Sequence, residues 1–235
     1  MTDGILHSFP NANDMVRALS DEIVSRLIES VSSRGVASLA ASGGTTPGIL
    51  FDALSARSAP WNKVSVTLAD ERWIAPDQDG SNEKLVRTRL LRNAASDAKL
   101  IPLKTPDASP DAAEAKVDGA ISAMPRPFDV MLLGMGDDGH TASLYPRSAG
   151  LDAALDLAKP NLVQAIHADS AVATGERMTF TLRAILDSKL IVILIRGEEK
   201  LATYRKAVAG MDIHEMPIRA VLNQARAPAR VYWSP

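Results

Sequence analysis

The groups best suited to acid–base chemistry lie in one short stretch of the chain. Residues 128–146 read FDVMLLGMGDDGHTASLYP, in which the apolar run from Val130 to Leu133 leads into glycines, aspartates and a histidine. Such a run is typical of a parallel strand covered on both faces. Ligands of open α/β sheets bind at the carboxyl ends of the strands. We therefore expect Asp137, Asp138 and His140 in an active site, with His140 as a general base.

Two other interpretations of this stretch exist. Residues 134–139 fit the pattern G-x-G-x-x-G of a dinucleotide-binding turn. Its two adjacent carboxylates would repel a pyrophosphate, and no acid follows about 20 residues later at a strand end. His140 could instead cap or pack locally. A histidine in a Gly/Asp turn after a buried strand is better placed for function.

A second segment has the composition of a phosphate site. It combines hydroxyl groups with glycines before an expected helix: Ser42, Gly43, Gly44 and Thr45. Hydroxyls and free N–H groups at a helix N-terminus suit a phosphate, although an ordinary strand-to-helix turn has the same composition. Two cations, Arg177 and Lys200, favour the phosphate, because a lysine at a helix start needs an anion nearby. The expected ligand is a sugar phosphate.

A third polar group follows the apolar segment 64–69, where Asp70, Glu71 and Arg72 come directly after the expected strand. Arg72 could form an ion pair with its neighbours or hold a substrate oxygen, and both readings stay open. Asp70 could orient another polar group or act as a base. Carboxyl ends of parallel strands share one rim, so these segments and Gly197 to Lys200 can converge on one pocket.

Periodicity and turn signals predict an alternating order of helices and strands. The expected helices cover 13–33, about 47 onward, 81–91, 112–123, 179–186, 197–208 and 217–222. The expected strands cover 36–41, 64–69, 130–133, 162–166, 190–195 and, as a last edge strand, 231–233, with a mobile loop over 168–176. This order indicates a parallel, doubly wound sheet in a single domain, residues 1–235.

The composition excludes several classes of protein. The chain has 235 residues, a net charge of −2 and mixed charges throughout, so no basic face for nucleic acid is evident. It has no cysteine, and its four histidines are not at metal-ligand spacing, so we expect no metal site. No leader pattern or membrane-length apolar run is present, which indicates a cytoplasmic protein with no membrane partner.

Several motifs together resemble those of the 6-phosphogluconolactonases. SGGTTP, LADERW, the SN pair at 81 and 82, LGMGDDGHTASLYP, ERMTFT and RGEEK occur in the family's order and approximate spacing. The match runs from about residue 38 to 206, and the element GxGxDGHTASL(F/Y)P is highly specific. The resemblance implies a modified Rossmann-like fold, a mostly parallel sheet with helices on both faces, similar to glucosamine-6-phosphate deaminase and ribose-5-phosphate isomerase A.

The resemblance also implies an activity and the residues that perform it. The activity is cofactor-free hydrolysis of 6-phosphoglucono-δ-lactone to 6-phosphogluconate, the second step of the oxidative pentose phosphate pathway. The family's phosphate loop falls on residues 42–45, its phosphate cations on Arg177 and Lys200, its base on His140 and its rim arginine on Arg72. Asp138, Asp70 and Gly136 complete the expected pocket. We expect a monomer or a weak homo-oligomer whose partner is a sugar phosphate lactone.

Two rival functions belong to the same fold. A deaminase would need a glutamate that helps to open the sugar ring, and Tyr145 stands at that place, where we expect it to pack beneath the loop. A non-catalytic sugar-phosphate sensor would need an output module, and no helix-turn-helix or basic helix accompanies the domain. The favoured mechanism is direct attack of water assisted by His140, because the chain has no G-x-S-x-G nucleophile motif.

Overall fold

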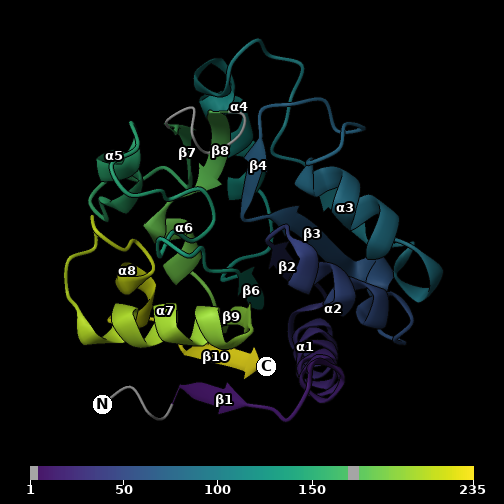
Figure 1. Ribbon diagram of the computed structural model, residues 1–235. Coiled ribbons are helices and arrows are strands. Elements are labelled where there is room, and N and C mark those ends of the chain that lie inside the picture. The colour runs from purple at the N-terminus through teal and green to yellow at the C-terminus, as the bar shows by residue number, and fades with distance from the viewer. Residues whose placement is uncertain (1–4, 169–174) are drawn as a thin grey trace.

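Two sheets of different kinds organise the protein. The computed structural model describes residues 5–168 and 175–235. Within them a seven-stranded sheet has the order β1-β10-β9-β6-β2-β3-β5, and its paired strands are all parallel. A three-stranded antiparallel sheet has the order β4-β8-β7. Figure 1 shows this small sheet at the end of the molecule opposite β1 and β10.

The strands of the large sheet are short, and the central ones are buried throughout. Its members are β1 (Leu6–Ser8), β2 (Ala37–Ala41), β3 (Val64–Leu68), β5 (Lys99–Ile101), β6 (Val130–Leu133), β9 (Ile191–Arg196) and β10 (Ala229–Ser234). Every residue of β2 and β6 is buried, as is β9 up to its last residue. Successive side chains of a strand point to opposite faces, so both faces of the sheet are covered. The predicted mostly parallel α/β fold is confirmed.

The helices follow the strands with few exceptions. They are α1 (Ala12–Arg34), α2 (Thr45–Ser55), α3 (Asn82–Arg89), α4 (Pro110–Ser122), α5 (Leu151–Leu155), α6 (Leu182–Leu186), α7 (Glu198–Ala209) and α8 (Arg219–Leu222). The longest, α1, begins where the Asn11 side chain accepts a hydrogen bond from the Asp14 N–H and ends at Gly35, whose φ of 79° suits glycine. Its buried side packs against β2 and β10.

The small sheet was not predicted. Its strands are β4 (Asp70–Arg72), β7 (Val163–His167) and β8 (Glu176–Phe180). The helix predicted over 179–186 is wrong in its first part, because β8 continues to Phe180 and the Thr181 side chain then caps α6. β4 pairs with β8 so that Arg72 lies opposite Arg177. The pairing brings two arginines, far apart in the sequence, to the same place.

Other predictions of elements need smaller corrections. β10 is not an edge strand, because β1 pairs with its outer side. Helix α2 begins at Thr45, two residues before the predicted start at Pro47. β1, β5 and α5 were missed because segments of three to five residues have no measurable periodicity. The loop predicted over 168–176 lies mostly outside the described residues. Among the described helices, none has the length and apolarity required to span a membrane.

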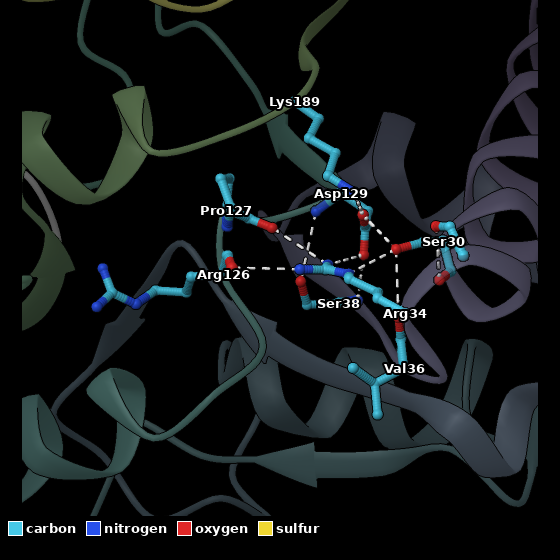
Figure 2. A network of polar contacts seen from close by, with 9 residues as sticks. Ser30, Arg34, Val36, Ser38, Arg126, Pro127, Asp129 and Lys189 are labelled. Carbon is cyan, nitrogen blue, oxygen red and sulfur yellow. Dashed lines mark hydrogen bonds and ion pairs between the residues drawn. The ribbon is translucent and has the colours of Figure 1, made fainter.

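A buried aspartate joins four segments at the end of the sheet away from the carboxyl ends of the strands (Figure 2). Asp129, 1% exposed, precedes β6 directly. One carboxylate oxygen accepts from Ser30 Oγ at 2.7 Å and lies 2.9 Å from Lys189 Nζ. The other accepts from the Ser38 N–H at 2.8 Å and from Arg34 Nη2 at 2.5 Å. This carboxylate fastens the end of α1 to β2 and β6.

Candidate active site

A cavity of about 290 Å³ opens at the carboxyl ends of β2 and β6, beside β4 and β8. Its lining is Ser42, Gly43, Gly44, Asp70, Arg72, Asn82, Gly134, Met135, Gly136, His140, Ala142, Tyr145, Arg177 and Lys200. It therefore brings together all the predicted site residues except Thr45, Asp137 and Asp138. Thr45 lines a neighbouring cavity with Arg72, and Asp138 lines another with Tyr145.

His140 and Asp138 form a closely coupled pair. His140 Nδ1 lies 2.6 Å from Asp138 Oδ1, and the His140 backbone N–H donates to the same oxygen at 3.0 Å. A carboxylate can only accept, so the Nδ1 proton faces Asp138 and Nε2 is left free to accept a proton. Burial raises the pKa of Asp138, but the hydrogen bonds from His140 outweigh it and bring that pKa below its ordinary value. Asp138 is therefore ionised at neutral pH.

Gly136 makes room for this pair. A Cβ atom on Gly136 would overlap the His140 ring and lie 2.7 Å from Asp138 Oδ1. The Gly136 N–H donates to the His140 carbonyl at 2.9 Å, which closes the turn. Because glycine has no Cβ atom, the imidazole of the same turn can lie directly against the backbone of Gly136.

Tyr145 covers one side of the imidazole. The ring centroids of Tyr145 and His140 are 4.2 Å apart at an interplanar angle of 38°. The Arg177 guanidinium carbon lies 5.1 Å from the Tyr145 centroid, a cation–π distance. Tyr145 is 6% exposed, so it packs as predicted and also forms a wall of the cavity. Burial raises the pKa of the Tyr145 phenol, which therefore stays protonated at neutral pH.

Two buried polar atoms at the cavity have no hydrogen-bond partner among the described residues. They are Ser42 Oγ and Arg177 Nε, in residues that are 4% and 3% exposed. Buried polar groups nearly always have a partner, and an unpaired one costs stability. Arg177 lies 3.8 Å from Asp70 through Nη1, which leaves Nε for another acceptor. Both atoms indicate a ligand with acceptor oxygens.

Lys200 and Arg72 supply two further cations. Lys200 Nζ lies 2.8 Å from Asp137 Oδ1, and the Asp137 side chain is 80% exposed. The anion that a lysine at a helix start requires is thus an exposed carboxylate, which a bound phosphate can displace. Arg72 donates a short hydrogen bond to the Gly80 carbonyl. Two interpretations of Arg72 were left open, an ion pair with its neighbours or a contact with a substrate oxygen. Among the described residues Arg72 has a carbonyl partner and no ion pair.

Asp70 lines the cavity, and Asp70 and Glu71 fix the positions of neighbouring segments through hydrogen bonds. Asp70 Oδ2 accepts from Ser143 Oγ at 2.6 Å, and Asn82 Nδ2 donates to the Asp70 carbonyl at 2.8 Å. Glu71 is fully buried and accepts from the N–H groups of Arg72, Asn82 and Glu83 and from Ser81 Oγ, at 2.7–3.0 Å. This carboxylate fixes the N-terminus of α3, where negative charge is favourable.

No role in the site was predicted for Asn82, Ser143 or Glu71, although Ser81 and Asn82 were expected to cap the helix that follows them. The SN pair at 81 and 82 is the only local signal in the sequence for Asn82. Ser143 Oγ contacts Asp70, which is 73 residues away in the sequence, so no local spacing could reveal this contact. The dinucleotide-binding interpretation of 134–139 is wrong, because no helix follows Gly139 directly and the next one begins at Leu151.

No group of three or more metal-binding side chains occurs in the part of the chain that the structure describes.

The chain is similar to known proteins over nearly its whole length. The profile of a family described as glucosamine-6-phosphate isomerases/6-phosphogluconolactonase matches residues 10–233. A 6-phosphogluconolactonase of Rhizobium meliloti is 42% identical over 231 residues, 98% of each chain. The crystal structure of a 6-phosphogluconolactonase from Shewanella baltica has a TM-score of 0.94 at 44% identity, covering 98% of this chain and 97% of that one. A monomeric glucosamine-6-phosphate deaminase has a TM-score of 0.78 at 17% identity, which shows a common fold.

Proposed function

The chain belongs to the glucosamine-6-phosphate isomerase/6-phosphogluconolactonase family, and on that premise we propose that it hydrolyses 6-phosphoglucono-δ-lactone to 6-phosphogluconate. The relatives named 6-phosphogluconolactonase that are 42% and 44% identical cover almost all of it, which supports this activity over the other one in the family's description. The enzyme is then a carboxylic ester hydrolase of the oxidative pentose phosphate pathway.

One observation carries the proposal. His140, which is paired with Asp138, lines the same cavity as Ser42 and Arg177, whose Oγ and Nε atoms are unpaired donors. A base and an anion site in one cavity suit a substrate that has a reactive carbonyl and a phosphate on the same carbon chain. We assign the phosphate to residues 42–45 with Arg177 and Lys200.

The mechanism uses His140 as the general base. Nε2 takes a proton from water while the water oxygen attacks the lactone carbonyl carbon C1, and Asp138 stabilises the imidazolium that forms. Arg72, or the N–H groups near 136–139, stabilises the negative charge that develops on the carbonyl oxygen. The C1–O bond of the ring then breaks, and the imidazolium returns the proton to the leaving ring oxygen. Atoms balance with one water added, and no acyl-enzyme forms.

The site is poorly equipped for the rival deaminase reaction. Opening an amino-sugar ring needs a carboxylate as a proton shuttle, and Tyr145 stands at that place with a phenol whose pKa burial raises. A protonated phenol cannot accept a proton as a carboxylate does. A sensor domain, by contrast, would not require a coupled imidazole–carboxylate pair beside its ligand.

A coupled assay tests the proposed function. Fresh 6-phosphogluconolactone is supplied with and without the protein, and 6-phosphogluconate is detected with its NADP-dependent dehydrogenase. We expect consumption well above the spontaneous rate, and much slower turnover of gluconolactone without phosphate. Turnover no faster than spontaneous hydrolysis contradicts the proposal. A cytoplasmic location, a monomeric or weakly associating state and the absence of nucleic-acid partners stay predictions, which fractionation, size-exclusion chromatography and binding assays can check.

A further inference from the structure

The amide of Asn82 has a fixed orientation. Nδ2 lies 2.8 Å from the Asp70 carbonyl oxygen and 3.2 Å from Asp70 Oδ1. Both of these atoms are acceptors, so the amide nitrogen, not the oxygen, must face Asp70. The backbone N–H of Asn82 donates to a Glu71 carboxylate oxygen at 2.8 Å, and the residue is 6% exposed. Asn82 is therefore held at two points on the rigid start of α3.

The amide oxygen consequently faces the phosphate loop. A Cβ atom on Gly43 would overlap Asn82 Oδ1, so the oxygen occupies the space that a side chain at position 43 would take. Asn82 lines the site cavity, and no donor among the described residues makes a hydrogen bond to Oδ1. A free acceptor thus stands beside the loop proposed to bind phosphate.

A second free acceptor in the cavity is the nitrogen His140 Nε2, and the proposed mechanism uses it to take a proton from water. The cavity's polar side chains Ser42, Arg72, Arg177 and Lys200 can all donate, which suits phosphate and carbonyl oxygens. The Asp70 carboxylate already faces Ser143, Asn82 and Arg177. A sugar acid lactone also carries hydroxyl groups, and each buried hydroxyl proton needs an acceptor.

We propose that Asn82 is a specificity-determining residue whose Oδ1 accepts a hydrogen bond from one ring hydroxyl of the substrate. This inference rests on the proposed function, since it takes the ligand to be a polyhydroxylated phosphate lactone. Asn82 joins the sugar-recognising part of the site to Asp70 and to α3. The competing view is that Asn82 only supports Asp70 and the loop, with Nδ2 as its important atom.

Two substitutions separate these views, because each keeps one half of the amide. Asn82→Ser keeps a short donor for Asp70 but lacks an acceptor over Gly43. Asn82→Asp keeps an acceptor there but lacks the donor to Asp70. The substrates are 6-phosphogluconolactone and its 2-, 3- and 4-deoxy analogues, and the readout is kcat/KM for each.

We expect the wild type to turn over one deoxy analogue about 10- to 100-fold less efficiently than the parent lactone, the usual effect of leaving a buried partner unpaired. In Asn82→Ser this discrimination falls to within about 3-fold of unity, whereas Asn82→Asp keeps most of it despite lower overall activity. A purely supporting role predicts unchanged discrimination in both variants, with Asn82→Asp the more impaired, and that result overturns the inference.

Controls keep the test decisive. Asn223→Ser, at the C-terminal end of α8 and outside the cavity lining, should leave discrimination and activity unchanged. Thermal melts check folding, and Asn82→Ala replaces Asn82→Ser if the latter unfolds. A wild type that does not hydrolyse the parent lactone refutes the proposed function. A wild type that hydrolyses it but treats all three deoxy analogues like the parent refutes only the role of Asn82.

Discussion

The imidazole of His140 is the group on which the chemical step depends. Its substitution by alanine removes the base but leaves the anion site intact, so we expect kcat to fall by roughly 2 to 4 powers of ten. The Kd for 6-phosphogluconate should change by no more than about 3-fold, because phosphate contacts dominate product binding. Stopped assays and calorimetric titration measure the two quantities. Turnover close to wild type would reject His140 as the base.

The ring of Tyr145, rather than its hydroxyl, should matter to the same step. The ring stands 4.2 Å from the imidazole and limits its movement. Tyr145→Phe keeps this wall and should keep kcat within about 3-fold, whereas Tyr145→Ala should lower it by about 10-fold or more, the order of effect expected when a catalytic group loses its positioning. KM should change less than kcat in both. Equal losses in the two variants would instead point to the phenol oxygen.

Lys200 should govern discrimination for the phosphate. Its partner Asp137 is exposed, so Lys200→Ala should cost at most about 1 kcal/mol of stability. It should raise KM for the phosphorylated lactone about 10- to 100-fold, as expected for a lost charge-assisted contact, and leave gluconolactone turnover unchanged. The matched variant Asp137→Asn removes a competing anion and should lower KM or leave it unchanged. An unaltered preference for the phosphorylated substrate in Lys200→Ala excludes this lysine as a phosphate ligand.

Individual residues differed in how far their sequence context revealed them. His140, Asp138 and the loop 42–45 could be recognised because the turn that holds each one is a continuous motif. Asn82 could not be assigned a role in the same way. Its importance comes from the direction of one amide, which the distant Asp70 sets and Gly43 makes room for.

Among the elements, α1 is fastened to the sheet by Asp129, which suggests a test of stability without a change in chemistry. The buried carboxylate faces Arg34 and Lys189, so Asp129→Asn leaves two cations without their counter-charge (Figure 2). We expect a loss of about 3 kcal/mol in the free energy of unfolding, as for other broken buried pairs. Urea denaturation measures it.

The matched control for Asp129 is Asp187→Asn. Asp187 pairs with Arg126 at 2.7 Å, and about a third of each side chain is exposed. That substitution should cost less than about 1 kcal/mol. Asp129 lies at the opposite end of β6 from the cavity, so kcat/KM of the folded Asp129→Asn enzyme should match the wild type. Equal destabilisation by the two substitutions would contradict the special role of Asp129.

The elements that escaped prediction share a physical cause. β4 and β8 are stabilised by pairing with each other, and the last two residues of β8, Thr179 and Phe180, were predicted as the start of a helix. Tertiary pairing overrides such local preference, and short strands carry too few residues for an alternating pattern. The long helix α1 was predicted within one residue at each end because 23 residues of periodicity leave little ambiguity.

For the whole molecule, the alternation of strands and helices was enough to predict the class of the sheet but not its outer strands. Parallel central strands are buried on both faces and therefore stand out as apolar runs. At one edge of the sheet β1 pairs with β10, and this long-range contact has no local signature in the sequence. A second long-range contact joins β10 to α1, where the Tyr232 hydroxyl donates a hydrogen bond to the Glu22 carboxylate.

The contact between Tyr232 and Glu22 predicts a specific pH dependence of the free energy of unfolding. Burial and the Glu22 carboxylate raise the pKa of Tyr232 to about 12 from an ordinary 10.0. Because the pKa of Tyr232 is higher in the folded protein, the stabilisation is fully present below pH 10 and is lost as the pH rises toward 12. Over this interval the phenol ionises in the unfolded chain before it ionises in the folded protein, which favours unfolding. Tyr232→Phe should therefore lower the free energy of unfolding by roughly 1–3 kcal/mol at pH 8. Urea melts should show this gap narrowing between about pH 10 and 11.5, because the variant lacks the ionising phenol. A gap that stays constant over this interval would show that the phenol contributes packing alone. In that case Glu22→Gln, which removes the negative charge but keeps an acceptor oxygen, should also leave the pH dependence of wild-type stability unaltered.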